Sequence, residues 1–327
     1  MLISPHDPFV IREKLLHAGV LQRINPFAIT KKSRVKARWK QTQEARLRHW
    51  YQVPAIIARL NQRISGDPRL GFHDLVCNHY LNDGTPRRAL ALGCGVGGRE
   101  LDWAARGIFT EILGLDIAPE RIAQANKEAE RQNMSHIARF EVSDVNDLVE
   151  QSEQFDVVLF EHSLHHFTDV KGTLTKVARL LSPGGLLIVD EFVGPRRFQW
   201  TPEQLAMADG LLLSIPARYR RFPNSQRTKN RNLRAGAALM WLNDPSEAVE
   251  SDAITPEVTS QFSVIARRDY GGTISQLVFQ DIAHHFVADD GENIAWANRI
   301  LDAEEYVIEK GILPSDFAAF ICKRKME

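Results

Sequence analysis

A glycine-rich segment followed by an acid is the part of this sequence best suited to bind a ligand. The run ALALGCGVGGRELDWA carries Gly93, Gly95, Gly97 and Gly98. Because glycine has no side chain, a ligand can approach the backbone here and reach the N-terminus of a following helix. Asp116 ends the next apolar run, where its carboxylate is placed to accept hydrogen bonds from ribose hydroxyls. These residues predict a nucleoside-binding site and therefore a cofactor-dependent enzyme.

The glycine turn alone does not specify the cofactor. Gly93, Gly95 and Gly98 also satisfy the dinucleotide pattern G-x-G-x-x-G, with an acid at roughly the right distance beyond it. An NAD(P)-dependent oxidoreductase is therefore one alternative. A protein that binds a cofactor without turnover is another.

Apolar runs and amphipathic segments alternate through the middle of the chain. Unbroken apolar runs at 155–160 and 186–191 are typical of buried parallel strands. A helical pattern at 169–181 lies between these two runs, and another at 119–133 precedes them. Further strands are expected at 262–267 and 317–322. The alternation predicts an α/β fold with a doubly wound, mostly parallel sheet.

The order of these motifs resembles that of the class I S-adenosylmethionine-dependent methyltransferases. ALGCGVGG is similar to the first motif of that family, GLDIAPERIAQA to the acid and helix after its second strand, and SDVNDL to its adenine-contacting loop. FDVVLFEHSLHHF and LSPGGLLIVDE resemble its fourth and fifth strands. The resemblance covers residues 88–191 closely. It implies a Rossmann-like, seven-stranded sheet with an antiparallel last strand.

The resemblance implies S-adenosyl-L-methionine as the cofactor. The predicted cofactor-binding residues are Gly93, Cys94, Gly95, Gly97, Asp116, Ile117, Asp144, Val145 and Glu161. The chain departs from the family at Ala91, where the family often has an acid that helps to hold the methionine ammonium. A backbone carbonyl or Glu161 would have to replace that acid.

Side chains that could accept a proton follow the two central apolar runs. In an open parallel sheet, substrate meets cofactor beyond the carboxyl ends of the strands. The candidate bases there are His162, His165, His166, Asp190 and Glu191. Imidazole gains and loses a proton near neutral pH, so His165 or His166 is the preferred base. A cluster of histidines and carboxylates favours a hydroxyl acceptor, as in O-methylation of a natural product or saccharide.

Magnesium is a candidate second cofactor, because some O-methyltransferases of the resembled fold hold it with carboxylates near these strand ends. Asp190 and Glu191 are adjacent, so on a strand their side chains should point to opposite faces. Asp281, His284 and His285 would share one face of a helix expected over 274–286 and could complete a site.

A basic stretch at 216–234 contains seven Arg or Lys residues and no acid. It lies in an insertion at about 192–260, where the resembled fold builds its substrate cover. Arginine binds anionic groups through paired hydrogen bonds. The predicted substrate-binding residues are Arg218, Tyr219, Arg221 and Tyr270. An RNA or protein methyltransferase that uses this stretch is the alternative. The segment after the fourth strand lacks the Asn/Asp-Pro-Pro-aromatic motif of amino-directed DNA methyltransferases, which argues against nucleic acid.

Composition fits a cytoplasmic enzyme of small molecules. The 41 basic and 41 acidic residues balance, which argues against a surface that coats nucleic acid. Three cysteines form neither a disulfide framework nor a zinc motif. No window approaches the roughly 20 apolar residues of a membrane span. We expect residues 1–85 to be a helical N-terminal extension or lid, and residues 86–327 to be the Rossmann-like domain. The N-terminal helices are a candidate homodimer interface.

Overall fold

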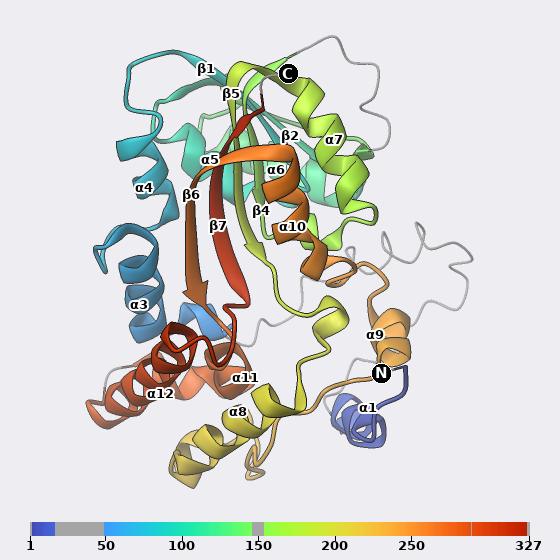
Figure 1. Cartoon of the computed structure of the whole chain (residues 1–327), viewed down its shortest axis with the longest axis vertical. Helices are drawn as coiled ribbons and strands as arrows, with labels where there is room; N and C mark the ends of the chain where they lie inside the picture. The colour runs from blue at the N-terminus through green and yellow to red at the C-terminus, as the bar shows by residue number, and fades with distance from the viewer. Residues whose placement is uncertain (1, 17–48, 146–153, 289, 326–327) are drawn as a thin grey trace.

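The computed structural model describes residues 2–16, 49–145, 154–288 and 290–325. Seven strands form one sheet in the order β3-β2-β1-β4-β5-β7-β6 (Figure 1). The strands are β1 (Arg87–Leu92), β2 (Phe109–Asp116), β3 (Ala138–Val142), β4 (Phe155–Glu161), β5 (Leu181–Phe192), β6 (Phe262–Gly271) and β7 (Phe317–Arg324). Neighbouring strands are parallel except at β7, which is antiparallel to both β5 and β6. The doubly wound sheet with an antiparallel last strand is therefore confirmed.

Helices cover both faces of the sheet because side chains alternate along its buried strands. One core contains Ala89, Val157 and Ile188 of the strands, packed with apolar side chains of the helices on this face of the sheet and of helices beyond its edge. The helices on this face are α3 (Pro54–Ser65), α4 (Phe72–His79), α5 (Gly98–Ala104) and α6 (Pro119–Arg131). The other core contains Leu90 and Val158 with α7 (Val170–Leu180) and α10 (Ser251–Gln261). Each central strand thus contributes to two cores.

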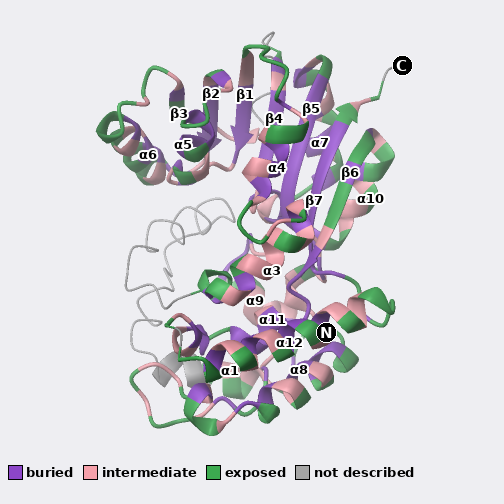
Figure 2. Ribbon diagram, turned by 90° about the vertical axis from the view of Figure 1, so that its left-hand side faces the viewer, coloured by how far each residue is buried: buried purple, intermediate pink, exposed green. Residues whose placement is uncertain are grey.

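A second layer of helices lies beyond the carboxyl ends of β4 and β5 (Figure 1). It includes α1 (Asp7–Leu16), α8 (Pro202–Ser214), α9 (Ala237–Asn243), α11 (Ser275–Phe279) and α12 (Glu292–Glu309). Short 3-10 helices complete it: η2 (Trp50–Gln52), η5 (Arg196–Phe198), η6 (Ala217–Arg220) and η7 (Ala283–Phe286). Figure 2 shows the sheet largely buried and these outer helices with one exposed side. The edge of the sheet where chemistry is expected is therefore covered by residues remote in sequence.

Two expected elements differ from the prediction. The segment expected as one helix over 274–286 is α11 followed by η7. The helix ends at Phe279, because Gln280 has an extended ψ of 134°, and the left-handed φ of 69° at Asp281 keeps the two helices apart. Residues 182–185 interrupt the pairing of β5, since Phe155 is opposite Leu181 and Val157 is opposite Leu186. β5 therefore begins at Leu181, ahead of the apolar run expected at 186–191. None of the helices within the described residues has the length and apolar composition needed to cross a membrane.

Candidate active site

The glycine turn connects β1 to α5 and requires glycine at its last position. Gly97 has a φ of 76°, and a Cβ there would lie 2.7 Å from the Phe140 ring. The turn meets the acid predicted from the sequence: Asp116 accepts hydrogen bonds from the backbone N–H groups of Gly95 (3.0 Å) and Ala118 (2.8 Å). These bonds fix the Asp116 carboxylate beside the turn.

The other predicted cofactor-binding residues lie along the same edge of the sheet. Cys94 and Ser143 donate backbone hydrogen bonds to the carbonyls of Leu115 (3.1 Å) and Asp116 (3.1 Å), respectively. Asp144 and Val145 follow directly after Ser143, and Ile117 follows Asp116. The loops after β1, β2 and β3 therefore meet around Asp116. This is where the carboxyl ends of parallel strands place a ligand.

Glu161, at the end of β4, is bound by side chains that the sequence analysis did not identify. It accepts hydrogen bonds from His73 Nε2 of α4 (2.7 Å) and Trp103 Nε1 of α5 (2.5 Å). Arg99 Nη1 lies 3.6 Å from the same carboxylate. Burial alone would raise the pKa of Glu161, but the charges and hydrogen bonds of these neighbours lower it. Glu161 is therefore an ionised acid whose position is fixed by two helices.

Glu100 is a second acid near the glycine turn, and the sequence analysis missed it as well. It lies in the first turn of α5, is 5% exposed, and its Oε2 has no hydrogen-bond partner. Burial and the nearby charge of Glu161 raise the pKa of Glu100 to about 8, and Asp116 contributes in the same direction. A buried carboxyl oxygen without a hydrogen-bond partner costs stability, so Oε2 is a candidate for binding a ligand.

A histidine, an aspartate and a tyrosine meet where β4 and β5 end. His162 Nε2 lies 3.5 Å from Asp190 Oδ2, and the Tyr270 hydroxyl donates to Asp190 Oδ1 (2.5 Å). Burial would raise the pKa of Asp190, but His162, Arg99 and Tyr270 lower it to about 2. The His162 side chain is 32% exposed, against 9% for that of His165. The group can therefore accept a proton from a bound molecule.

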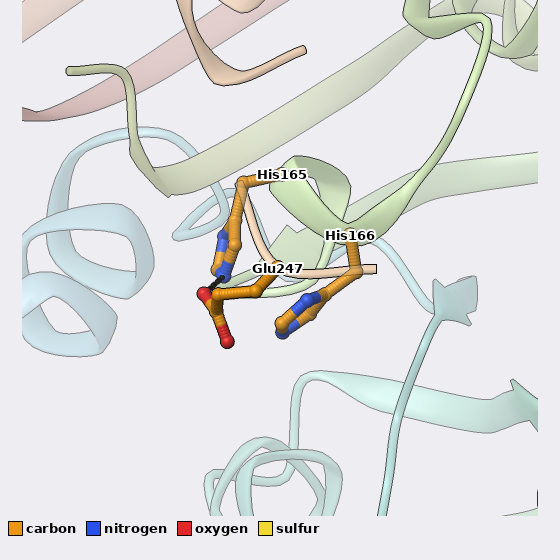
Figure 3. Close-up of side chains that lie close together, drawn as sticks. All are labelled: His165, His166 and Glu247. Carbon is orange, nitrogen blue, oxygen red and sulfur yellow. Dashed lines mark ion pairs between the residues drawn. The ribbon is translucent and has the colours of Figure 1, made fainter. Parts of the chain in front are cut away.

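The remaining predicted bases form a second cluster. Glu191 is fully buried and accepts hydrogen bonds from the N–H groups of Ser163 and Leu164 (2.5 Å each) and pairs with His165 Nδ1 (2.5 Å). Burial lowers the pKa of His166, whereas Glu191 outweighs burial and raises that of His165. Glu247, from the insertion, completes this cluster (Figure 3). Glu191 thus holds the segment after β4 rather than facing a ligand.

The carboxylates expected to hold magnesium are not brought together. Asp190 and Glu191 point to different partners, as their adjacency on β5 predicts. Asp281 is exposed, and His285 Nε2 pairs with the Arg221 carbonyl. Within the described ranges, the only group of three or more potential ligands is His165, His166 and Glu247.

The basic insertion is mostly engaged in internal contacts. Arg218 forms an ion pair with Glu292, and the Tyr219 hydroxyl donates to Asp290 (2.9 Å), so both bind the start of α12. Lys229 is buried and donates to three backbone carbonyls, including that of Leu277 (2.5 Å). The Arg221 side chain is exposed. These contacts hold the insertion against α11 and α12.

Comparison with known proteins matches the same segment. Residues 90–189 match the model of the family described as "Methyltransferase domain". A demethylmenaquinone methyltransferase of Thermus thermophilus is 34% identical over 110 residues, which are 34% of this chain and 49% of that protein. A ubiquinone biosynthesis O-methyltransferase of Maricaulis maris is 36% identical over 126 residues, 37% of this chain and 48% of that protein. The chain spans about half the length of these curated relatives.

Solved structures are also similar to the chain. The N-methyltransferase NodS of Bradyrhizobium japonicum, in complex with S-adenosyl-L-homocysteine, aligns with a TM-score of 0.43 and 14% identity over 78% of this chain and 86% of its own. Strand order distinguishes the fold from that of dinucleotide-binding oxidoreductases, whose sheet has the order 3-2-1-4-5-6. The glycine turn, the acid after β2 and the antiparallel β7 agree with this match: residues 90–189 match the methyltransferase domain, and the sheet that contains them has the Rossmann-like fold of the class I S-adenosylmethionine-dependent methyltransferases.

Proposed function

We propose that this protein transfers the methyl group of S-adenosyl-L-methionine to a hydroxyl of a small molecule, such as a natural product or a saccharide. The observation that carries the proposal is the His162–Asp190–Tyr270 group at the same sheet edge as the glycine turn. Relatives whose names specify O-methylation or a demethylated natural product support the acceptor class.

The residues of the turn fit a cofactor with a ribose and a positively charged end. Asp116 would accept hydrogen bonds from the ribose, and Ile117, Asp144 and Val145 would border the adenine. Glu161 supplies negative charge beside the turn, and Glu100 would supply more on losing its proton, because its pKa is raised to about 8. The Oε2 of Glu100 has no hydrogen-bond partner and fits a cationic group of the cofactor. Glu100 would thus replace the acid that the family often has at the position of Ala91. The bound cofactor supplies an electrophilic methyl group.

The protein then has to position the acceptor and remove one proton. The acceptor oxygen forms its bond to carbon as the sulfur–carbon bond breaks, and the hydroxyl proton passes to His162. Asp190 stabilises the imidazolium that forms, because it is ionised and lies 3.5 Å from Nε2. Tyr270 fixes Asp190 in this position. Residues 192–260, with exposed Arg221, would cover the acceptor.

His162→Gln tests this assignment. We expect kcat for methylation of a hydroxylated acceptor to fall by roughly 10²- to 10⁴-fold, the usual contribution of a general base. The dissociation constant of S-adenosyl-L-homocysteine, measured by calorimetry, should stay unchanged because His162 is not assigned to the cofactor.

His136→Gln is the matched control, because His136 is exposed and remote in sequence from the strand ends. Full turnover in His162→Gln, with loss in His165→Gln, would move the base to the second cluster. Binding of NADH in place of S-adenosyl-L-homocysteine would overturn the proposed function itself.

A further inference from the structure

The cluster of His165, His166 and Glu247 has the donor atoms of a metal site. The two histidines belong to η4 (Leu164–His166), and Glu247 reaches them from the insertion. Their ligand atoms lie within 4.8 Å of one another, and His165 Nε2 is 3.6 Å from Glu247 Oε1. Figure 3 shows the three side chains converging. Two imidazoles and one carboxylate are a common ligand set for transition metals.

Each histidine is oriented through its other ring nitrogen. His165 Nδ1 pairs with Glu191 Oε2 (2.5 Å), and His166 Nδ1 pairs with the Ser246 carbonyl (3.2 Å). Both partners accept hydrogen bonds, so in the neutral ring the proton lies on Nδ1 and the lone pair on Nε2. Metal-binding histidines show this arrangement, in which a carboxylate or carbonyl fixes the tautomer and the ring orientation.

The backbone around Glu247 is fixed to the same region. Val249 N–H donates to the His165 carbonyl (3.0 Å), and Arg197 Nη1 donates to the Glu247 carbonyl (3.2 Å). Ala248 has a left-handed φ of 46°, which is a strained conformation for a residue with a side chain. Strain of this kind persists where the surrounding structure imposes it, as at ligand sites. The position of Glu247 is therefore set by the fold.

We propose that His165, His166 and Glu247 bind a divalent transition-metal ion of the Zn²⁺ type. The two imidazole nitrogens favour such an ion over Mg²⁺, which prefers oxygen ligands. Three protein ligands leave one position of a tetrahedral ion for water or an oxygen ligand. The site is open on the side of Glu247, whose side chain is 24% exposed, whereas His165 is buried at 7% exposure. The ion would join the insertion to the segment after β4, independently of methyl transfer.

Cobalt absorption provides the test on the full chain after treatment with a chelator. Co²⁺ should bind with one equivalent, give the visible bands of a tetrahedral nitrogen–oxygen site, and be displaced by Zn²⁺. Glu247→Gln and His166→Gln should each weaken Co²⁺ binding at least tenfold. Glu203→Gln, an exposed acid of the same insertion, and His136→Gln should bind Co²⁺ like the parent protein. Circular dichroism verifies that each variant is folded.

Glu191→Gln separates a metal site from a merely structural histidine cluster. The amide oxygen of this variant would still accept from the Ser163 and Leu164 N–H groups, but its NH₂ would face His165 Nδ1. The ring would then carry its proton on Nε2 and lose its ligand atom, so Co²⁺ affinity should fall 10- to 100-fold. Absence of the cobalt bands in the parent protein, or equal Co²⁺ affinity in the parent, Glu247→Gln and His166→Gln, would overturn the proposal. His162→Gln should keep full Co²⁺ binding, so failure of the proposed methyl transfer would leave this result intact.

Discussion

We expect Glu100 to make cofactor affinity depend on pH, because burial and Glu161 raise its pKa to about 8. If a cationic cofactor group binds beside it, the ionised form of Glu100 binds more tightly, and binding below pH 8 must release its proton. The dissociation constant of S-adenosyl-L-methionine should therefore rise by up to about tenfold for each pH unit below 8. Calorimetry between pH 6 and 8.5 measures this dependence.

Glu100→Gln is the comparison for this prediction. The amide cannot ionise, so the variant should bind the cofactor more weakly at pH 8.5, and its affinity should vary less with pH. Parallel pH profiles in the parent protein and the variant would show that Glu100 does not sense the cofactor charge.

Some residues of the candidate site could be predicted from the sequence, and others could not. Asp116 was predictable because strand, turn and acid are contiguous motifs. Glu100 was not, since an acid in the first turn of a helix is typical of a solvated position near the helix dipole. Its raised pKa depends on burial and on the charge of Glu161, which lies 61 residues later in the sequence. Glu247 is likewise brought to His165 only by the tertiary fold.

At the scale of elements, the glycine turn and α5 depend on one position. Gly97→Ala should lower the free energy of unfolding by at least about 1–2 kcal/mol, the usual cost of a left-handed φ for a residue with a Cβ. Contacts of 2.7 Å to Phe140 and 2.9 Å to Ala125 add to this cost. Urea unfolding followed by circular dichroism measures it.

Gly98→Ala is the matched control for this element. Gly98 is the first residue of α5, and a Cβ there would meet no atom within 4 Å. Alanine is the better helix former, so this variant should be as stable as the parent protein or slightly more stable. A loss in Gly98→Ala equal to that in Gly97→Ala would assign the effect to the helix rather than to the turn.

Elements built from local patterns were predictable, whereas their interruptions were not. Apolar runs identified β4 and β5 because parallel strands are buried on both faces. The helix expected over 274–286 ends early at Phe279, and no local pattern indicates the extended Gln280 and left-handed Asp281 that follow it. In the N-terminal extension, expected to be helical, the part described from residue 49 onward begins with the short η2, and α3 starts only at Pro54.

Across the whole molecule, Asp316 joins the sheet to the second helical layer. Its Oδ2 accepts hydrogen bonds from Gln204 Nε2 of α8 (2.9 Å) and Trp200 Nε1 (3.2 Å), and its backbone pairs with Val193 and Gly194. Burial raises the pKa of Asp316 to about 7. The folded state therefore binds this proton more tightly than the unfolded chain does.

This proton makes global stability depend on pH. The stabilisation is fully present below about pH 4, the unfolded pKa, and is lost as the pH rises to about 7, at up to about 1.4 kcal/mol per pH unit. Asp316→Asn should show a shallower fall in the free energy of unfolding between pH 4 and 7. Glu100 contributes with the same sign in both proteins, so the difference between the two curves isolates Asp316. Superimposable slopes would assign the pH dependence to other groups.

The position of β7 has a consequence for how the molecule acquires its structure. β6 is synthesised before β7, yet its ladder of hydrogen bonds is made with β7, which also separates it from β5. Until residues 317–324 are in place, one edge of β5 is unpaired and β6 has no strand to pair with. Unpaired edges can associate with other chains. During synthesis on the ribosome, the sheet can therefore close only after the polypeptide has emerged through residue 324, and the nascent protein would expose these edges to chaperones until then.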